Sequence, residues 1–284
     1  MEIAVPISVV IRTKNSSSTI GNCLQSLTRQ TVTQDIIIVD SGSTDDTLDI
    51  VYRYPCRILH YPKTEVFNYS AALNMGIAAA TYPCVLLLSS HVELQHEQSL
   101  EWMQHFLLTD EVVKSVSLSR SARRMVGEEL VTFEQVDWYT VDISNFRGQG
   151  MFNYCAMIRK SDWEVQAFDV TMPACEDQAW INHFIQTQNA KAVIIRYPYV
   201  HYDNPYYNLS KDIRDHLVIA QRVHPYQGSA AFIKQKYRIA WRYLRNRNWQ
   251  RARHEFLLGF HLTRNKIAPI DISRYASVYN KKLK

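Results

Sequence analysis

The chain has 284 residues, of which 46% are hydrophobic and 21% charged, with a formal net charge of +5. This length and composition allow one large core or two smaller ones in a globular protein. No apolar run is long enough to span a membrane, and the N-terminus lacks the pattern of a secretory signal. The five widely spaced cysteines form no Cys-x-x-Cys pair, which argues against a cysteine zinc site or a disulfide framework. We therefore expect a cytoplasmic protein.

Strands and helices alternate along the first half of the chain. The sequence predicts a strand at Ile7–Arg12, a helix over residues 20–27 and a buried strand at Ile36–Val39. This order implies a right-handed parallel crossover. Further strands are expected at Cys56–Tyr61, Val85–Leu88, Val92–Leu94, Val112–Leu118, Tyr154–Ile158, Ala192–Ile195 and Tyr199–His201, and further helices at Ala71–Ala80, at Leu100–Leu108 and after Asp177 through Gln186. The pattern indicates an α/β fold with an open sheet.

Asp40 and Ser41 directly follow the strand at Ile36–Val39. They should lie at the carboxyl end of that strand, where open α/β sheets place their ligands. Gly42 permits a turn, and Ser43 or Thr44 is the expected cap of the next helix. The alternative is that Asp40 is only a turn residue.

The second half contains an irregular segment and a basic end. Between Ser119 and Gly150 the pattern breaks, and Arg120, Arg123 and Arg124 cluster there; long irregular segments are often functional loops. From residue 229 two apolar stripes predict two helices joined by a turn at residues 246–248. Between residues 234 and 266 ten lysines and arginines accompany one acid. We expect a domain at residues 1–228 and a basic helical extension at residues 229–284.

The basic extension has three interpretations. We expect a solvated helix face that also docks a membrane or an anionic acceptor. The second is that the apolar stripes pack on each other or on the catalytic domain and leave only the basic faces free, and the third is a nucleic-acid surface. RNA-binding motifs are absent, so we expect no nucleic acid as partner.

Four polar segments should meet at one edge of the sheet: residues 12–15, 40–43, 89–91 and 176–177. Carboxylates, hydroxyls and basic groups together suit a nucleotide. No Gly-x-Gly-x-x-Gly motif or P-loop occurs, so neither a dinucleotide fold nor a phosphate-cradling NTPase is supported.

In these polar segments and the motifs around them, the chain resembles the family 2 glycosyltransferases of the GT-A fold. The motifs that carry the resemblance are Ile7–Asn15, Leu24–Thr31, Ile36–Thr47, Ala72–Gly76, Ser89–His91, Asn153–Lys160 with Trp163, and Glu176-Asp177 with Trp180. They cover roughly residues 5–205, in the family's order and spacing. The first and third motifs are most similar to a bacterial rhamnosyltransferase-like subgroup.

The resemblance implies an open, mostly parallel twisted sheet with helices on both faces. It also implies an inverting glycosyltransferase that moves a sugar from a nucleotide donor to a hydroxyl acceptor, a glycan or glycolipid intermediate. The nucleotide-sugar-binding residues would be Arg12, Thr13, Asn15, Asp40, Ser41, Asn74, Ser89, Ser90 and His91. Among them, Thr13, Asp40 and Ser41 would line the base and ribose pocket, and Asn74 would lie near the diphosphate. Many relatives carry a second Asp at Ser41, so base contacts can differ here.

The family's Asp-x-Asp motif, whose second acid ligates a divalent metal, falls on Ser89-Ser90-His91. The resemblance then makes His91 and His201 the candidate metal ligands, and imidazole favours Mn²⁺ over Mg²⁺. Two alternatives remain: His91 binds the phosphates by hydrogen bonds without a metal, or Arg12, Lys14 or Arg123 replaces the metal.

Glu176-Asp177 resembles the family's acceptor-side acidic pair. Asp177 is the candidate general base and Glu176 would hold the acceptor or the loop. The alternative is that both acids only cap a helix. An inactive nucleotide-sugar-binding protein is the main competing function, because both acids of the metal motif are absent. A nucleotidyltransferase is the third candidate, but it would need an acid pair at Ser89–His91 and a glycine-rich basic N-terminal loop, and the sequence has neither.

Overall fold

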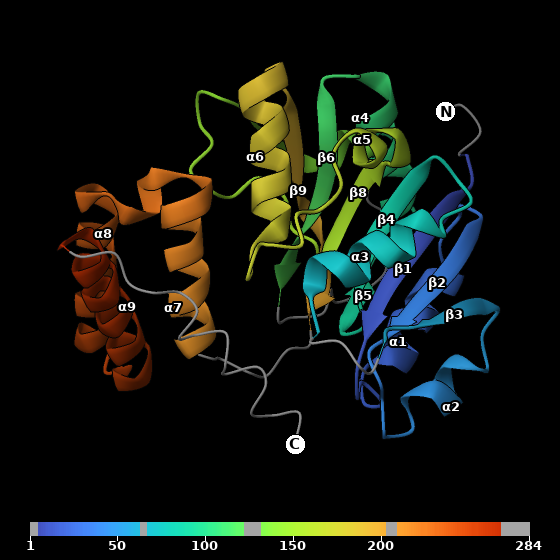
Figure 1. The fold of residues 1–284 in the computed structure, drawn as a ribbon, viewed down its shortest axis with the longest axis horizontal. Coiled ribbons are helices and arrows are strands. Elements are labelled where there is room, and N and C mark those ends of the chain that lie inside the picture. The colour runs from blue at the N-terminus through green and yellow to red at the C-terminus, as the bar shows by residue number, and fades with distance from the viewer. Residues whose placement is uncertain (1–4, 63–66, 122–131, 203–208, 268–284) are drawn as a thin grey trace.

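The computed structural model describes residues 5–62, 67–121, 132–202 and 209–267. Within them one sheet forms in the order β3-β2-β1-β4-β8-β6-β9-β5, with β7 paired to β9 (Figure 1). Its strands are β1 (Ile7–Thr13), β2 (Gln34–Asp40), β3 (Cys56–His60), β4 (Cys84–Ser89), β5 (Val92–Leu94), β6 (Val113–Ser121), β7 (Asp137–Val141), β8 (Cys155–Arg159) and β9 (Lys191–Tyr202). Strands β3, β2, β1 and β4 run parallel to one another, whereas β8 is antiparallel to both β4 and β6. The predicted α/β sheet is confirmed, with its parallel part at β3-β2-β1-β4.

Helices cover both faces of the sheet. They are α1 (Ile20–Thr28), α2 (Thr47–Val51), α3 (Tyr69–Ala78), α4 (Ser99–Thr109), α5 (Lys160–Val165), α6 (Glu176–Gln188), α7 (Leu209–Val218), α8 (Ala230–Arg245) and α9 (Trp249–Ile267). One core cluster joins α1, α2 and α4 to one face, and a second joins α3 and α6 to the other. Alternation along β1 explains this, because Val9 and Ile11 enter the first cluster while Val10 enters the second. The carboxyl ends of β1, β2 and β4 carry the buried polar residues Thr13, Asp40 and Ser89.

Several predicted boundaries differ from the structure. The helix after Asp40 begins only at Thr47, and its N-cap residue is Asp46 rather than Ser43 or Thr44. The two strands expected near residues 192–201 form one long strand, β9, which continues through a cis peptide bond at Tyr197-Pro198. The irregular segment contains a strand that the sequence did not predict, β7, whose side chains are mostly exposed.

The helical end of the chain begins before residue 229. Helix α7 contributes Ile213 and Leu217 to a small core with Ile233 of α8 and with Leu258 and Leu262 of α9. Figure 1 shows these three helices together beside the sheet, with α7 between the α8–α9 pair and the rest of the molecule. No helix among the described residues is both long and apolar enough to cross a membrane.

Candidate functional site

The turn after β2 is built by Asp40. Its side chain is 2% exposed. It accepts hydrogen bonds from the backbone N–H of Gly42 at 3.0 Å, the N–H of Ser43 at 3.2 Å and the Ser43 hydroxyl at 2.6 Å. Gly42 has a φ of 85°, a conformation in which a side chain would be strained. The Ser43 hydroxyl, which donates to Asp40 and accepts from the Asn15 N–H, is therefore used within the turn and does not cap the helix.

The ends of β1 and β2 are joined through this turn. Thr13 and Asp40 are partners in the parallel register, and the Ser41 N–H donates to the Thr13 carbonyl at 3.0 Å. The Asn15 N–H donates to the Ser43 hydroxyl at 3.0 Å, and the Asn15 amide oxygen accepts from the Thr44 N–H at 2.8 Å. The predicted segments 12–15 and 40–43 are therefore joined by hydrogen bonds at one edge of the sheet.

The end of β4 is attached to the same edge. Ser89 is the register partner of Arg12, and the hydroxyl oxygens of Ser90 and Ser16 lie 2.9 Å apart. The Thr13 hydroxyl is buried, and no group of the described chain bonds to it. A buried hydroxyl without a partner costs free energy unless a ligand or water supplies one, so Thr13 fits its predicted place in a binding pocket.

Glu176 and Asp177 occupy the first turn of α6, not the loop before it. Cys175 precedes them in the left-handed conformation, with φ of 58°, which turns the chain sharply into the helix. Both acids are buried, Glu176 at 4% and Asp177 at 8% exposure. No side-chain cap of this helix is formed. Neither acid therefore caps the helix through its side chain. Their negative charges are still favourable in the first turn, where they face the positive end of the helix dipole.

Asn153, just before β8, holds both acids. Its side-chain amide donates to Glu176 Oε1 at 2.7 Å, and its backbone N–H donates to Asp177 Oδ2 at 3.2 Å. Asp177 Oδ1 accepts from the N–H of Gln178 at 2.8 Å. The sequence did not identify Asn153 as a site residue, although it lies in a matched motif. Only the folded arrangement reveals this double contact.

Burial and the neighbouring Glu176 carboxylate raise the pKa of Asp177 to about 7. The two backbone N–H groups and the Arg12 guanidinium oppose this rise. A buried carboxyl beside a like charge resists ionisation for both reasons. Asp177 is therefore able to exchange a proton near neutral pH, which is the range a general base requires.

Arg12 connects the two ends of the site. Its guanidinium lies 3.6 Å from Glu176 Oε1 and 5.0 Å from the centre of the Tyr69 ring. The side chain is 10% exposed, and its buried Nη1 lacks a hydrogen-bond partner in the described part of the chain. A buried cation with a spare donor is suited to an anionic or hydroxyl ligand.

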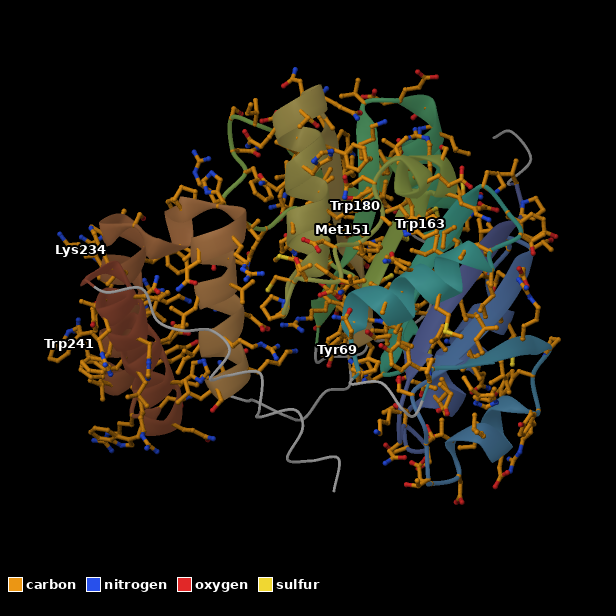
Figure 2. The ribbon with its side chains drawn as sticks, viewed as in Figure 1. Tyr69, Met151, Trp163, Trp180, Lys234 and Trp241 are labelled. Carbon is orange, nitrogen blue, oxygen red and sulfur yellow. The ribbon has the colours of Figure 1, made fainter. Side chains whose placement is uncertain are left out.

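Asn74 has contacts that the sequence did not suggest. From α3, its amide nitrogen donates to the Phe168 carbonyl at 2.8 Å, and its amide oxygen accepts from Trp163 Nε1 at 2.8 Å and from the Phe168 N–H at 3.1 Å. Trp163 is half-buried against the second core cluster, and Figure 2 shows it above α3. The amide thus fastens the segment after α5 to α3, and within the described residues its hydrogen bonds go to Trp163 and Phe168 and not to the other site residues. Its place beside a diphosphate stays a prediction.

His91 and His201 line one small hollow between α1 and β5, together with Thr19, Asn22, Cys23, Val92 and Glu93. Glu93 and His201 are cross-strand partners in β5 and β9. The buried His201 Nδ1 has no hydrogen-bond partner among the described residues. The described chain contains no group of three or more His, Cys, Asp or Glu arranged to hold a metal. A cation held by the predicted ligands His91 and His201 would need its remaining ligands from substrate or water.

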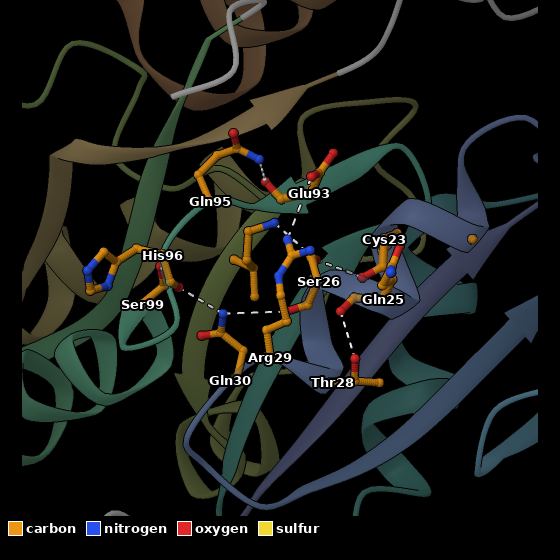
Figure 3. A network of polar contacts seen from close by, with 12 residues as sticks. Cys23, Gln25, Ser26, Thr28, Arg29, Gln30, Glu93, Gln95, His96 and Ser99 are labelled. Carbon is orange, nitrogen blue, oxygen red and sulfur yellow. Dashed lines mark hydrogen bonds and ion pairs between the residues drawn. The ribbon is translucent and has the colours of Figure 1, made fainter. Parts of the chain in front are cut away.

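A polar network fixes β5 against α1 (Figure 3). The Ser26 hydroxyl donates to the Cys23 carbonyl at 2.7 Å and accepts from the Leu94 N–H at 3.0 Å. Arg29 lies 3.7 Å from Glu93. The short strand that follows His91 is therefore held in place although it has only three residues.

Two other cationic residues were predicted as alternatives to a metal. Lys14 is exposed, and Arg123 lies outside the described residues.

The chain is similar in sequence to known glycosyltransferases. The sequence profile described as glycosyl transferase family 2 matches residues 8–158. A PGL/p-HBAD biosynthesis glycosyltransferase of Mycobacterium tuberculosis is 32% identical over 105 residues, covering 35% of this chain and 41% of the relative. The chondroitin synthase of Escherichia coli is 32% identical over 116 residues, covering 40% of this chain and 16% of the synthase. The matches thus span less than half of either relative.

Solved structures share the fold. A mannosyltransferase from Pyrobaculum calidifontis, in complex with GDP-Man and Mn²⁺, superposes with a TM-score of 0.67 at 13% identity, covering 95% of this chain and 89% of that one. Glucosyl-3-phosphoglycerate synthase from Mycobacterium tuberculosis, in complex with Mn²⁺, UDP and glucosyl-3-phosphoglycerate, gives 0.56 at 17% identity, covering 78% and 80%. At these identities the likeness is one of fold, and the fold expected from the sequence is confirmed.

Proposed function

The chain belongs to glycosyl transferase family 2 and is a glycosyltransferase, and we propose that it transfers a sugar from a nucleotide donor to a hydroxyl acceptor with inversion. The observation that carries this proposal is Asp177, a buried carboxyl whose pKa lies near 7 beside Glu176 and Arg12. It stands at the same sheet edge as the predicted donor residues. A base and a donor pocket at one edge are what a direct displacement requires.

The chemistry needs no enzyme nucleophile. Asp177 accepts the proton of the acceptor hydroxyl as that oxygen bonds to the anomeric carbon. The bond from this carbon to the diphosphate oxygen breaks on the opposite face, and the nucleoside diphosphate leaves. Glu176, held by Asn153 and Arg12, keeps the Asp177 carboxyl poised near neutral pH and contacts the acceptor.

On the donor side, we propose that Thr13, Asp40 and Ser41 line the base and ribose pocket. Arg12, Asn15, Ser89, Ser90 and His91 complete the predicted donor-binding set along the ends of β1 and β4. Support comes from the contacts that join these segments and from the unpartnered Thr13 hydroxyl. Asn74 contributes through the segment it fastens. The likeness of the first motifs to rhamnosyltransferase-like proteins adds deoxysugar donors to those worth testing.

The departing diphosphate gains charge, so a cation must face it. We propose that His91 and His201 hold a divalent ion, Mn²⁺ rather than Mg²⁺, which would neutralise that charge when bound. The shared hollow and the unpartnered His201 Nδ1 support this. Chelation should abolish activity, and Mn²⁺ should restore it better than Mg²⁺. Full activity after exhaustive chelation would instead assign the role to a cationic side chain such as Arg12.

The proposed acceptor is a glycan or a lipid-linked intermediate, and the proposed location is the cytoplasm with peripheral contact to the inner face of a membrane. The relative from Mycobacterium tuberculosis is named for PGL/p-HBAD biosynthesis, and this name supports the general class of transfer. Nucleic acid is not among the proposed partners.

A thermal-shift screen tests the donor directly. UDP-, dTDP- and GDP-sugars are added with and without Mn²⁺, and one class should raise the midpoint of unfolding because it binds only the folded state. At about 100 times its Kd, a ligand adds roughly 2.7 kcal/mol, a shift of several degrees. The same donor should then release nucleoside diphosphate when an acceptor is supplied. Binding without any release would favour the inactive binding protein, and no binding to any sugar nucleotide would contradict the proposal.

A further inference from the structure

The outer side of α8 carries a basic stripe. Four cationic residues and one tryptophan recur at helical spacing and are all exposed: Lys234, Arg238, Trp241, Arg242 and Arg245. With Tyr237 and Asn246 they line an open hollow of about 740 Å³. In the view of Figure 2, Lys234 and Trp241 lie at the outer edge of the molecule, on the side away from Tyr69 and Trp163.

Helix α9 carries a second exposed stripe, in which aromatic residues alternate with cations. Its members are Trp249, Arg253, Phe256, Phe260 and Arg264. Trp249 is 69% exposed, Phe256 53% and Phe260 44%. Exposed large aromatic side chains that gather on one face usually mark an interaction surface.

The two helices do not need these residues for their own packing. Their shared interior is made by Ile233, Ala240, Ala252, Leu258 and Leu262, each at most 7% exposed. The Tyr237 and Phe256 rings lie 5.5 Å apart and connect this interior to the α9 stripe. The predicted apolar stripes are therefore split: one part packs between the helices, and Trp241, Trp249 and the two phenylalanines remain at the surface.

We propose that the stripes of α8 and α9, together the basic aromatic face, bind the surface of a bilayer containing anionic phospholipids. The charge supports this occupant, because the one acid between residues 234 and 266, Glu255, is largely buried and lies 3.3 Å from Lys236. Tryptophan side chains prefer the headgroup level of a bilayer. Each cation near an anionic lipid surface contributes on the order of 1 kcal/mol to the binding free energy.

The face is attached to the reaction site through α7. His254 of α9 lies 3.1 Å from Asp212 of α7. Cys175, the residue before the acidic pair, donates through Sγ to the Asp215 carbonyl at 3.6 Å. A bilayer bound by α8 and α9 would thus be connected through α7 to the acidic pair, and it would hold the site near the membrane that carries a lipid-linked acceptor. This point rests on the proposed function, whereas binding to vesicles does not.

Vesicle co-sedimentation of the full chain tests the proposal. Vesicles of phosphatidylcholine with about one third phosphatidylglycerol should pellet the protein at low salt, and pure phosphatidylcholine should not. Because surface cations act through screened charge, about 0.5 M salt should release most of the bound protein. Arg238→Gln with Arg242→Gln should weaken binding about thirtyfold, the value of two such cations.

The matched control removes two exposed arginines of the sheet domain, Arg53→Gln with Arg196→Gln, and should leave vesicle binding unchanged. Trp241→Ala with Trp249→Ala should also weaken binding, whereas Tyr52→Ala, equally exposed at 67%, should not. Donor-induced thermal shifts in every variant report folding and an intact donor site.

Equal pelleting with neutral and anionic vesicles, or none with either, would overturn the proposal. So would a single-stranded RNA that binds more tightly than the vesicles and competes them off, because the face would then be a nucleic-acid surface. A loss of vesicle binding in the control pair equal to that in the α8 pair would show only a general charge effect. None of these results bears on donor binding, so the proposed transfer activity would stand or fall separately.

Discussion

Two buried carboxyl groups lie at the same sheet edge and differ in what surrounds them. Asp40 is enclosed by its own turn, where the N–H groups of Gly42 and Ser43 and the Ser43 hydroxyl bind its oxygens. Asp177 receives two backbone N–H groups and faces the carboxylate of Glu176. The first carboxylate holds the turn after β2 together, and the second is left able to take up a proton. Similar burial therefore serves different chemistry, and the neighbours decide which.

The largest expected effect separates these two roles. Asp177→Asn keeps the size of the side chain and removes the proton acceptor. Turnover should fall about 100-fold or more, the scale of general-base catalysis, while the donor-induced thermal shift stays nearly unchanged. A variant that keeps more than about a third of wild-type turnover would mean that another group takes the proton.

The pH dependence of stability gives the next effect. Folding raises the pKa of Asp177 to about 7, well above its unfolded value of 3.8. Between these values the folded state binds a proton that the unfolded state lacks. The stabilisation is therefore complete at low pH and is lost as the pH rises through 7.

Urea unfolding at pH 5 and pH 8 measures this loss. Between the two pH values the wild type should lose at least about 1.4 kcal/mol more than Asp177→Asn, the value of one pKa unit. Equal losses in both proteins would show that Asp177 titrates normally. The comparison uses differences within each protein, because the asparagine also changes a hydrogen bond to the Asn153 N–H.

Asp40→Ala should have an intermediate effect. Without the carboxylate the turn loses its three internal hydrogen bonds, so donor affinity should fall about tenfold, near the value of one such bond to a charged group. Asp40→Asn retains one acceptor oxygen and should lose less. Circular dichroism should show both variants folded; an unfolded Asp40→Ala protein would support the interpretation of Asp40 as a turn residue only.

The smallest effect on donor binding belongs to Asn74. Because its amide is used by Trp163 and Phe168, Asn74→Ala should lower the thermal midpoint by roughly 5 °C, from the loss of two to three hydrogen bonds. Donor affinity should change no more than about twofold. A tenfold loss of affinity at unchanged stability would restore the predicted contact with the diphosphate.

The sequence predicted the parallel part of the sheet well, because continuous branched apolar runs such as Ile36–Val39 are typical of buried parallel strands. It failed where tertiary contacts override local preference. Ser43 has the residue type of a helix cap, yet its hydroxyl is bonded to Asp40 and Asn15, and α2 starts later. Strand β7 escaped prediction because its exposed residues show no alternation, and pairing with β9 alone defines it.

The candidate site residues remain predictions, and the contacts among them could not be predicted from the sequence. Asp177 and Asp40 could be named because each follows or opens a recognisable element. Asn153 could not, since its contact with two acids more than 20 residues away depends on how the chain returns before β8. The burial that shifts the Asp177 pKa is likewise a property of the fold and leaves no local pattern.

The most direct test is the pH dependence of kcat/KM in the wild type and in Glu176→Gln, with the donor found by the screen and its acceptor. If Asp177 is the base, wild-type kcat/KM rises with an apparent pKa near 7 and then levels off. Removing the neighbouring carboxylate lowers the pKa of Asp177, so the rise should move to lower pH in Glu176→Gln. A profile that is flat from pH 5.5 to 8.5, or a rise at the same pH in both proteins, would contradict the role given to Asp177.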